Sequence, residues 1–79
     1  MEVIIKNITM AGFSKIYNAF QKQITGYSVY SKTNTVNVFL GDSSFWKIGT
    51  FSWGVYLTNE KNNVTITLSG KEFNKIIIQ

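Results

Sequence analysis

The side chains best suited to acid–base chemistry in this chain are carboxylates, and they are few and widely separated. They are Glu2, Asp42, Glu60 and Glu72. Because no two fall on one predicted element, they form neither the close carboxylate pair of a glycosidase nor the ligand cluster of a calcium loop. The chain has no histidine and no cysteine, which excludes Ser-His-Asp and Cys-His catalysis and removes the usual zinc ligands. We therefore expect no enzymatic activity, no cofactor and no metal ion.

A second set of residues is suited to binding. Tyr30, Phe39 and Tyr56 stand among small polar residues, and the alternation predicts that they share a sheet face that a helix leaves open. Such rings can stack the exposed bases of a single-stranded nucleic acid or a nucleotide. An open apolar patch is also typical of a surface that binds a protein. A further alternative is that a terminal helix or a second subunit covers these rings.

The candidate binding residues combine these aromatics with their neighbours. Trp46 and Lys47 belong to segment 45–48, which fits a short edge strand, a bulged start of the next strand or an ordered loop. Gly54, two residues before Tyr56, would leave room for a flat ligand to approach the backbone. The complete candidate set is Tyr30, Lys32, Phe39, Trp46, Lys47 and Tyr56.

Charge and composition favour a protein partner. The formal net charge of +4 is carried by lysine alone, without any arginine. Arginine is the side chain that reads guanine edges, so sequence-specific groove recognition is not indicated, although lysine suffices for contacts to phosphate. A compact chain without Cys, His, Pro or Arg has the composition typical of a phage or mobile-element accessory protein. We therefore favour a protein-interaction module that binds and inhibits a host or defence protein, with binding of nucleic acid or nucleotide as the alternative.

Residues 45–70 contain the clearest secondary-structure pattern. Apolar residues occupy every second position of 51–57 and of 64–68, on either side of the polar break 59–63. This alternation about an Asn-rich turn predicts a β-hairpin with one apolar face. We expect that face to form core beneath a helix; it consists of Phe51, Trp53, Val55, Leu57, Val64, Ile66 and Leu68.

The first half of the chain predicts three strands and one long helix. The strands are Val3–Ile8, Tyr27–Ser31 and Thr35–Leu40. A helix is expected over Met10–Thr25, with Thr9 as N-cap and Gly26 just past the end. The residues expected on its apolar stripe are Met10, Phe13, Ile16, Tyr17, Phe20 and Ile24.

The C-terminal segment has two readings. Ser69 and Glu72 have the spacing of a capping box, which predicts a short helix over Gly70–Ile78. The triplet 76–78 consists of β-branched isoleucines, so a final strand stays open as the alternative.

These elements together predict an α+β fold in a single domain spanning residues 1–79. The expected order is β-α-β-β-β-β-α, with one antiparallel sheet of four to five strands, the long amphipathic helix on one face and the short C-terminal helix. A domain of this size often gains burial by dimerising, so a homodimer is a further expectation. No signal peptide or membrane-spanning run is evident, which predicts a cytoplasmic protein without a membrane partner.

Overall fold

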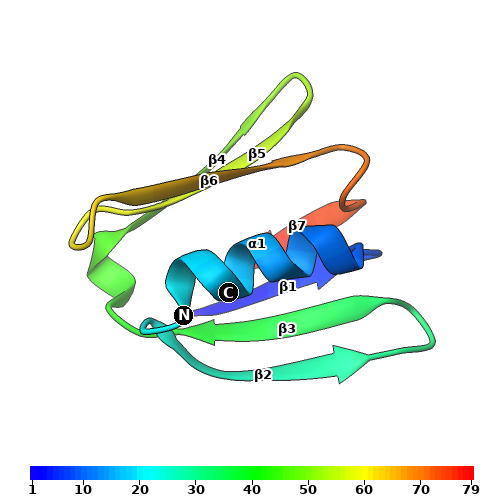
Figure 1. Ribbon diagram of the computed structural model, residues 1–79, viewed down its shortest axis with the longest axis horizontal. Helices are drawn as coiled ribbons and strands as arrows, with labels where there is room; N and C mark the ends of the chain where they lie inside the picture. Colours follow the sequence, from blue (N-terminus) through cyan, green and yellow to red (C-terminus); the bar gives the residue numbers. More distant parts are fainter.

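The computed structural model describes residues 1–79 and contains two antiparallel sheets and one α-helix (Figure 1). The elements are β1 (Glu2–Lys6), α1 (Met10–Phe20), β2 (Ile24–Tyr30), β3 (Thr35–Leu40), the 3₁₀ turn η1 (Ser43–Phe45), β4 (Trp46–Phe51), β5 (Gly54–Asn59), β6 (Val64–Ser69) and β7 (Lys75–Ile78). The strand orders are β2-β3-β1-β7 and β4-β5-β6. The α+β class is as expected, but the expected single sheet and the order β-α-β-β-β-β-α are wrong.

The chain leaves the first sheet at a sharp bend after β3. Asp42 has a φ of 53°, in the left-handed region, and η1 follows it directly. This bend redirects the chain, so that β4 starts a second sheet instead of extending the first. In Figure 1, α1 lies between the three-stranded sheet and strands β1 and β3 of the larger one.

One hydrophobic core joins the two sheets and the helix. Its buried side chains come from β1, α1, β3, β5 and β6, with Ile8 from the turn before the helix. They are Val3, Ile5, Ile8, Ile16, Phe20, Val36, Val38, Leu40, Val55, Leu57 and Leu68. Since both sheets contribute to the same cluster, we expect them to unfold together.

The helix is shorter than predicted. The Thr9 N-cap is confirmed, because its hydroxyl accepts a hydrogen bond from the Gly12 amide at 3.1 Å. The end at Thr25 is wrong: α1 stops at Phe20, and the Gln23 amide closes a turn onto the Phe20 carbonyl. Ile24 and the β-branched Thr25 then enter β2, where extended backbone suits them.

The buried face of α1 also differs from the predicted stripe. It runs through Gly12, Ile16 and Phe20, whereas Met10 is 81% exposed and Tyr17 is 41% exposed. Gly12 belongs to this face because the segment before β7 crosses the helix there, with the Glu72 carbonyl oxygen 3.2 Å from the position of a Cβ on Gly12. The rotation leaves Met10 and Tyr17 on a side that neither sheet covers.

The predicted hairpin of residues 51–68 is correct in its second half only. Val55 and Leu57 pair with Leu68 and Ile66, as the alternation predicted. However, residues 51–57 are not one strand, because Ser52 and Trp53 form the turn between β4 and β5. Trp53 therefore lies at a loop tip, 60% exposed, instead of in the core. At this loop tip its ring packs on the Phe51 ring, with the ring centroids 4.2 Å apart.

Two open questions about short segments are answered by the structure. Phe45 ends η1, and residues 46–48 begin β4, which is an edge strand. At the C-terminus the predicted helix over Gly70–Ile78 is wrong, and the alternative strand is correct. Glu72 does accept from the Ser69 amide at 3.0 Å, but the turn does not continue, because 76–78 pair with β1.

Candidate functional site

The predicted aromatic face is divided between the two sheets. Tyr30 and Phe39 lie on the outer face of the larger sheet, opposite Thr35 and Gly26 respectively. Tyr56 lies on the outer face of the other sheet, on β5. The structure therefore does not bring the three rings together as one stacking platform.

Tyr56 rests on Gly49, its cross-strand partner on β4. A Cβ on Gly49 would overlap the tyrosine ring, so this glycine makes room for Tyr56 itself. Gly54 has no free space either, because the Leu68 backbone of β6 occupies the place of its Cβ. Neither glycine leaves an opening for a flat ligand.

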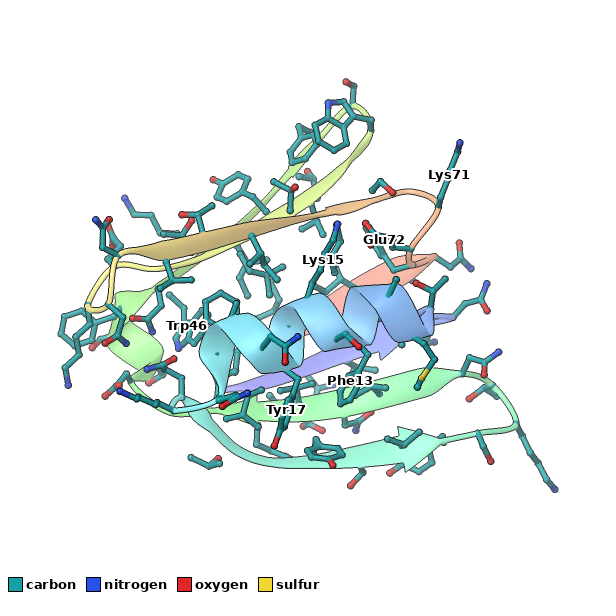
Figure 2. All side chains as sticks on the ribbon, in the orientation of Figure 1. Phe13, Lys15, Tyr17, Trp46, Lys71 and Glu72 are labelled. Atoms are coloured by element: carbon teal, nitrogen blue, oxygen red, sulfur yellow. The ribbon has the colours of Figure 1, made fainter.

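Trp46 and Lys47 have local partners. The Trp46 indole donates to the Gly41 carbonyl at 2.7 Å and packs edge-on against Phe20, with ring centroids 4.7 Å apart. Lys47 forms an ion pair with Glu60 at 3.3 Å. These contacts connect β4 to the core and to the turn after β5, and Figure 2 shows Trp46 beside the C-terminal end of α1.

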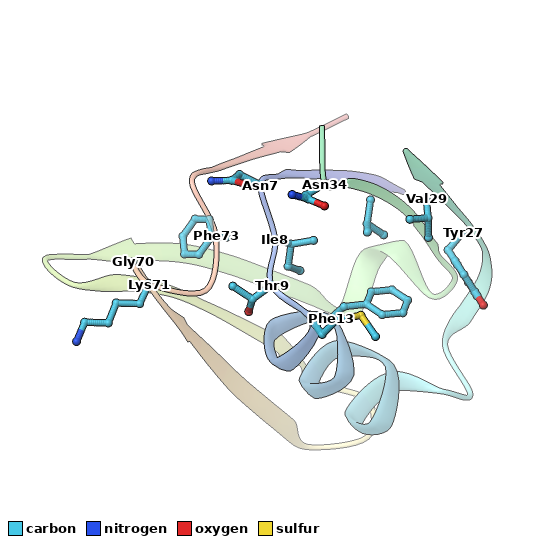
Figure 3. Close-up of a pocket in the computed structure, with 12 residues that line it drawn as sticks. Asn7, Ile8, Thr9, Phe13, Tyr27, Val29, Asn34, Gly70, Lys71 and Phe73 are labelled. Atoms are coloured by element: carbon cyan, nitrogen blue, oxygen red, sulfur yellow. The ribbon is translucent and has the colours of Figure 1, made fainter. Parts of the chain in front are cut away.

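A hollow of the molecule lies elsewhere, between the N-terminal part of α1 and β2 (Figure 3). We call it the α1–β2 groove; its volume is about 600 Å³. Its lining is mostly apolar, with polar side chains and one lysine toward the loops. The lining residues are Asn7, Ile8, Thr9, Met10, Phe13, Tyr27, Val29, Asn34, Val36, Gly70, Lys71 and Phe73.

Three aromatic rings at the α1 and β2 side of this groove pack on one another. The Phe13 ring lies 6.2 Å from that of Tyr17 and 5.5 Å from that of Tyr27, and the two tyrosine rings are 6.2 Å apart. Phe13 is partly buried against the core, whereas Tyr17 is 41% exposed and Tyr27 is half exposed. Their edges and faces pack on one another, which fixes the cluster but leaves no ring free on both sides for stacking.

Strand β2 has a hydrogen-bonding partner on one side only, because it stands at the end of the order β2-β3-β1-β7. Every residue from Tyr27 to Tyr30 is exposed. The strand contains neither a charged residue nor a proline, two common means by which proteins protect a sheet edge, and its one irregularity in register lies at its start, between Ile24 and Gly26. Its free backbone groups are therefore accessible to another extended chain.

A second hollow lies on the other side of β2, around the turn to β3. We call it the outer hollow; its volume is about 530 Å³. Most of its lining is polar, and it includes two residues predicted for binding, Tyr30 and Lys32. The lining residues are Val29, Tyr30, Ser31, Lys32, Thr33, Thr35 and Asn37. Val29 borders both hollows, so β2 separates an apolar depression from a polar one.

Every carboxylate side chain of the molecule has a hydrogen-bonding or ion-pair partner, whereas most of the lysines have no carboxylate partner. All four carboxylates have partners: Asn37 donates to Glu2 at 2.9 Å, and Asp42, Glu60 and Glu72 form ion pairs with lysines. Five lysines have no such pair, namely Lys6, Lys22, Lys32, Lys71 and Lys75. Neither hollow is lined by an acidic residue, and each is lined by one of these lysines, Lys71 in the α1–β2 groove and Lys32 in the outer hollow.

Glu72 connects α1 to the segment that leads into β7. The Ser69 amide and the Lys15 ammonium both donate to its carboxylate, and together they lower the pKa of Glu72 below its usual value. Lys15 and Glu72 lie side by side in Figure 2, 3.0 Å apart at their charged atoms. This pair fixes the wall of the α1–β2 groove that carries Gly70 and Lys71.

No group of three His, Cys, Asp or Glu side chains comes close enough to hold a metal ion. The single α-helix is too short and too polar to cross a membrane.

The sequence pattern placed Tyr30 at the end of a strand and Lys32 in the turn after it, as in the structure, but missed Met10, Tyr17 and Tyr27 as surface residues. The helical stripe assigned Met10 and Tyr17 to the core, whereas Phe13 of the same stripe is partly buried against the core. One signal was present: residues 24–31 contain no charge, which is unusual for a strand at a sheet edge.

Comparison of the chain with protein-family models, curated proteins and solved structures finds no match. The functional proposal therefore depends on the chemistry and geometry of the chain's own residues.

Proposed function

We propose that this protein is a non-enzymatic interaction module that binds an extended segment of another protein along β2. The observation that carries the proposal is the uncharged, unpaired edge of β2 beside the aromatic cluster of Phe13, Tyr17 and Tyr27, whose two tyrosines are exposed. An extended peptide that adds to such an edge as a further strand forms main-chain hydrogen bonds with it, which supply affinity. Hollows that accept every second side chain of the peptide supply selectivity.

The apolar groove would supply the affinity. Val29 is 57% exposed and Tyr27 is half exposed, and both belong to the wall that an added strand would cover. Burial of apolar surface contributes about 25 cal/mol per Å², and aromatic side chains often dominate protein interfaces. A partner's apolar side chain that enters the groove would cover these residues together with Phe13.

The composition extends the proposal to a biological role. A phage or mobile-element accessory protein would act in the cytoplasm by occupying a surface of a host or defence protein. Binding to the edge of a sheet suits such a role, because extended segments are accessible in many unrelated proteins.

Single-stranded nucleic acid is the competing ligand. The five lysines without ion pairs favour it, whereas the separation of Tyr56 from Tyr30 and Phe39 disfavours a stacking surface. An oligothymidylate therefore competes with peptides in the binding experiment.

The test is selection of binders from a displayed library of random peptides, followed by synthesis of one selected peptide. We expect N-methylation of its backbone to weaken binding at alternate positions only, because every second amide of an added strand points to β2. We expect Val29→Glu to weaken binding at least about tenfold, because it places a charge against an apolar surface.

Thr50→Glu is the matched control, since Thr50 is exposed on β4, an edge strand of the other sheet. Binding that Thr50→Glu weakens as much as Val29→Glu, or that N-methylation nowhere affects, contradicts the proposal. So does an oligothymidylate that binds more tightly than any selected peptide.

A further inference from the structure

One of the two hollows beside β2 has a mostly apolar lining and the other a mostly polar lining. This difference indicates which side chains a partner would place on each face of the sheet. The side chains of a strand point alternately to the two faces of its sheet. A strand added to β2 would therefore place one set of side chains at the α1–β2 groove and the other set at the outer hollow. This placement rests on the proposed function, in which β2 is the docking edge.

The groove side selects apolar residues. Met10, Phe13, Tyr27 and Val29 line its open part, and the nearest charged group is Lys71 at the loop end, whose side chain points away from the groove in Figure 3. A polar side chain placed among the apolar residues would lose water without gaining a partner.

The outer side selects polar and acidic residues. Lys32 lines the outer hollow, is exposed and has no carboxylate partner. Ser31, Thr33 and Thr35 add hydroxyl groups around it. The only carboxylate beside this hollow is that of Glu2, which accepts a hydrogen bond from the lining residue Asn37 at 2.9 Å and forms no ion pair with Lys32.

We propose that the partner is an amphipathic extended segment of a different protein, with apolar residues at alternate positions and acidic residues between them. Its apolar side chains occupy the α1–β2 groove, and its carboxylates face Lys32. All strand pairs in the larger sheet are antiparallel, so the partner adds in the antiparallel direction.

A second copy of this chain fits the site less well. Twofold pairing of two β2 strands would bring only residues from Ile24–Tyr30 and the adjoining turns to the interface, and none of them is acidic. Lys32 would remain without a counter-charge, and two molecules of net charge +4 would repel each other.

The experiment uses labelled peptides of about eight residues, the length of a typical strand or slightly longer. One alternates Val with Glu, one Val with Lys and one Val with Thr; a fourth has the composition of the first in blocks of two Val and two Glu. Affinity is measured by fluorescence anisotropy at about 0.05 M and about 0.5 M salt, where the screening lengths differ severalfold.

We expect the Val-Glu peptide to bind about fivefold more tightly than the Val-Lys peptide at low salt, with most of the difference lost at high salt. The blocked peptide should bind weakly, because its side chains do not alternate. Lys32→Glu should reverse the preference between Glu and Lys. Lys75→Glu, an equal charge change on β7 at the far edge of the same sheet, should leave the preference in place.

The outcomes separate this inference from the proposed function. Binding of all three alternating peptides with equal affinity overturns the acidic pattern and leaves docking on β2 intact. Binding of none overturns both proposals. A preference for Glu that Lys32→Glu does not change also overturns the inference. If the protein dimerises and thereby displaces the Val-Glu peptide, the peptide loses affinity at high protein concentration. That result overturns the inference and identifies a second copy of the chain as the occupant.

Discussion

The sheet β4-β5-β6 neutralises its charges locally, whereas the sheet β2-β3-β1-β7 carries lysines that have no carboxylate partner. In the smaller sheet, Lys47 pairs with Glu60, and Lys61 pairs with Asp42 at 3.5 Å. Thr58 and Thr65 also share a cross-strand hydrogen bond of 2.9 Å on its outer face. In the larger sheet, Lys6 and Lys75 are direct neighbours on β1 and β7, a pairing of like charges that costs stability.

The contrast extends to the apolar surface. Each exposed aromatic of the smaller sheet has a local contact: Trp53 packs on Phe51, Phe45 lies 5.6 Å from the Lys61 ammonium, and Tyr56 lies over Gly49. The larger sheet exposes Tyr27 and Val29 along a free strand edge. Both sheets have open edges, so the difference between them is that the lysines of the smaller sheet are paired with carboxylates, whereas the free edge of β2 lies beside two hollows and unpaired lysines.

The largest expected effect comes from the core that joins the two halves. Phe20→Ala should lower the free energy of unfolding by about 4 kcal/mol, because it removes a fully buried ring between the sheets. Urea denaturation followed by tryptophan fluorescence and by circular dichroism should give one shared transition. Separate transitions for the two probes would show that the halves are independent.

Replacing one glycine in each sheet by alanine tests whether the smaller sheet is more tightly packed than the larger one. Gly54→Ala should destabilise the protein by about 2–3 kcal/mol, because the new methyl group would overlap the Leu68 backbone of β6. Gly26→Ala on β2 is the control: its Cβ would meet only the Phe39 ring, at an ordinary 3.9 Å. Equal midpoints of thermal unfolding for the two variants would refute the tight packing of the smaller sheet.

The aromatic cluster gives a smaller effect. A double-mutant cycle with Phe13→Ala and Tyr27→Ala should yield a coupling free energy of about 0.5–1 kcal/mol, because the partly buried Phe13 ring contacts the half-exposed Tyr27 ring. The same cycle with Phe51→Ala and Tyr27→Ala should give none, as these residues lie in different sheets. Additive effects of Phe13→Ala and Tyr27→Ala would mean that α1 and β2 do not interact through their rings.

The smallest effect concerns Glu72, whose pKa is lowered first by the hydrogen bond from the Ser69 amide and then by Lys15. A lowered pKa in the folded state means that the stabilisation is present above the pKa of the unfolded chain. It is lost as the pH falls through the folded value. Stability measured by urea denaturation should therefore fall below about pH 4.3.

The Glu72→Gln variant should be less stable by about 0.5–1 kcal/mol at neutral pH. Its free energy of unfolding should also fall less steeply at low pH, because the contribution from Glu72 is absent. Glu60→Gln is the control, since the Glu60–Lys47 pair is exposed. An unchanged acid limb in Glu72→Gln would contradict the assignment.

Local signals in the sequence predicted most strands and the start of the helix. The Thr9 cap, the 64–68 strand and the turn before it depend on near neighbours, and all are as expected. The division into two sheets depends on the bend at Asp42 and the turn at Ser52 and Trp53, and neither has the Asn-Gly or Asp-Gly signature of a tight turn. The capping box at Ser69 formed without a helix, because pairing of 76–78 with β1 outweighs one local contact.

The candidate site was harder to predict for the same reason. Tyr30 and Lys32 follow directly from the strand and turn pattern, but the exposure of Met10 and Tyr17 depends on how far α1 is rotated. That rotation is set by the approach of the Glu72 backbone to Gly12, a contact between residues 60 positions apart in the sequence.

The central place of β1 in its sheet has a kinetic consequence. Its neighbours are β3, an intermediate distance along the chain, and β7, at the far end of the described residues. Contacts between residues so far apart in the sequence form slowly, because closing a long loop costs entropy before the contact contributes any stability. We expect β1 and β3 to pair while β7 is still free, so that β1 is for a time an open edge of the larger sheet, a position that β7 takes in the native chain.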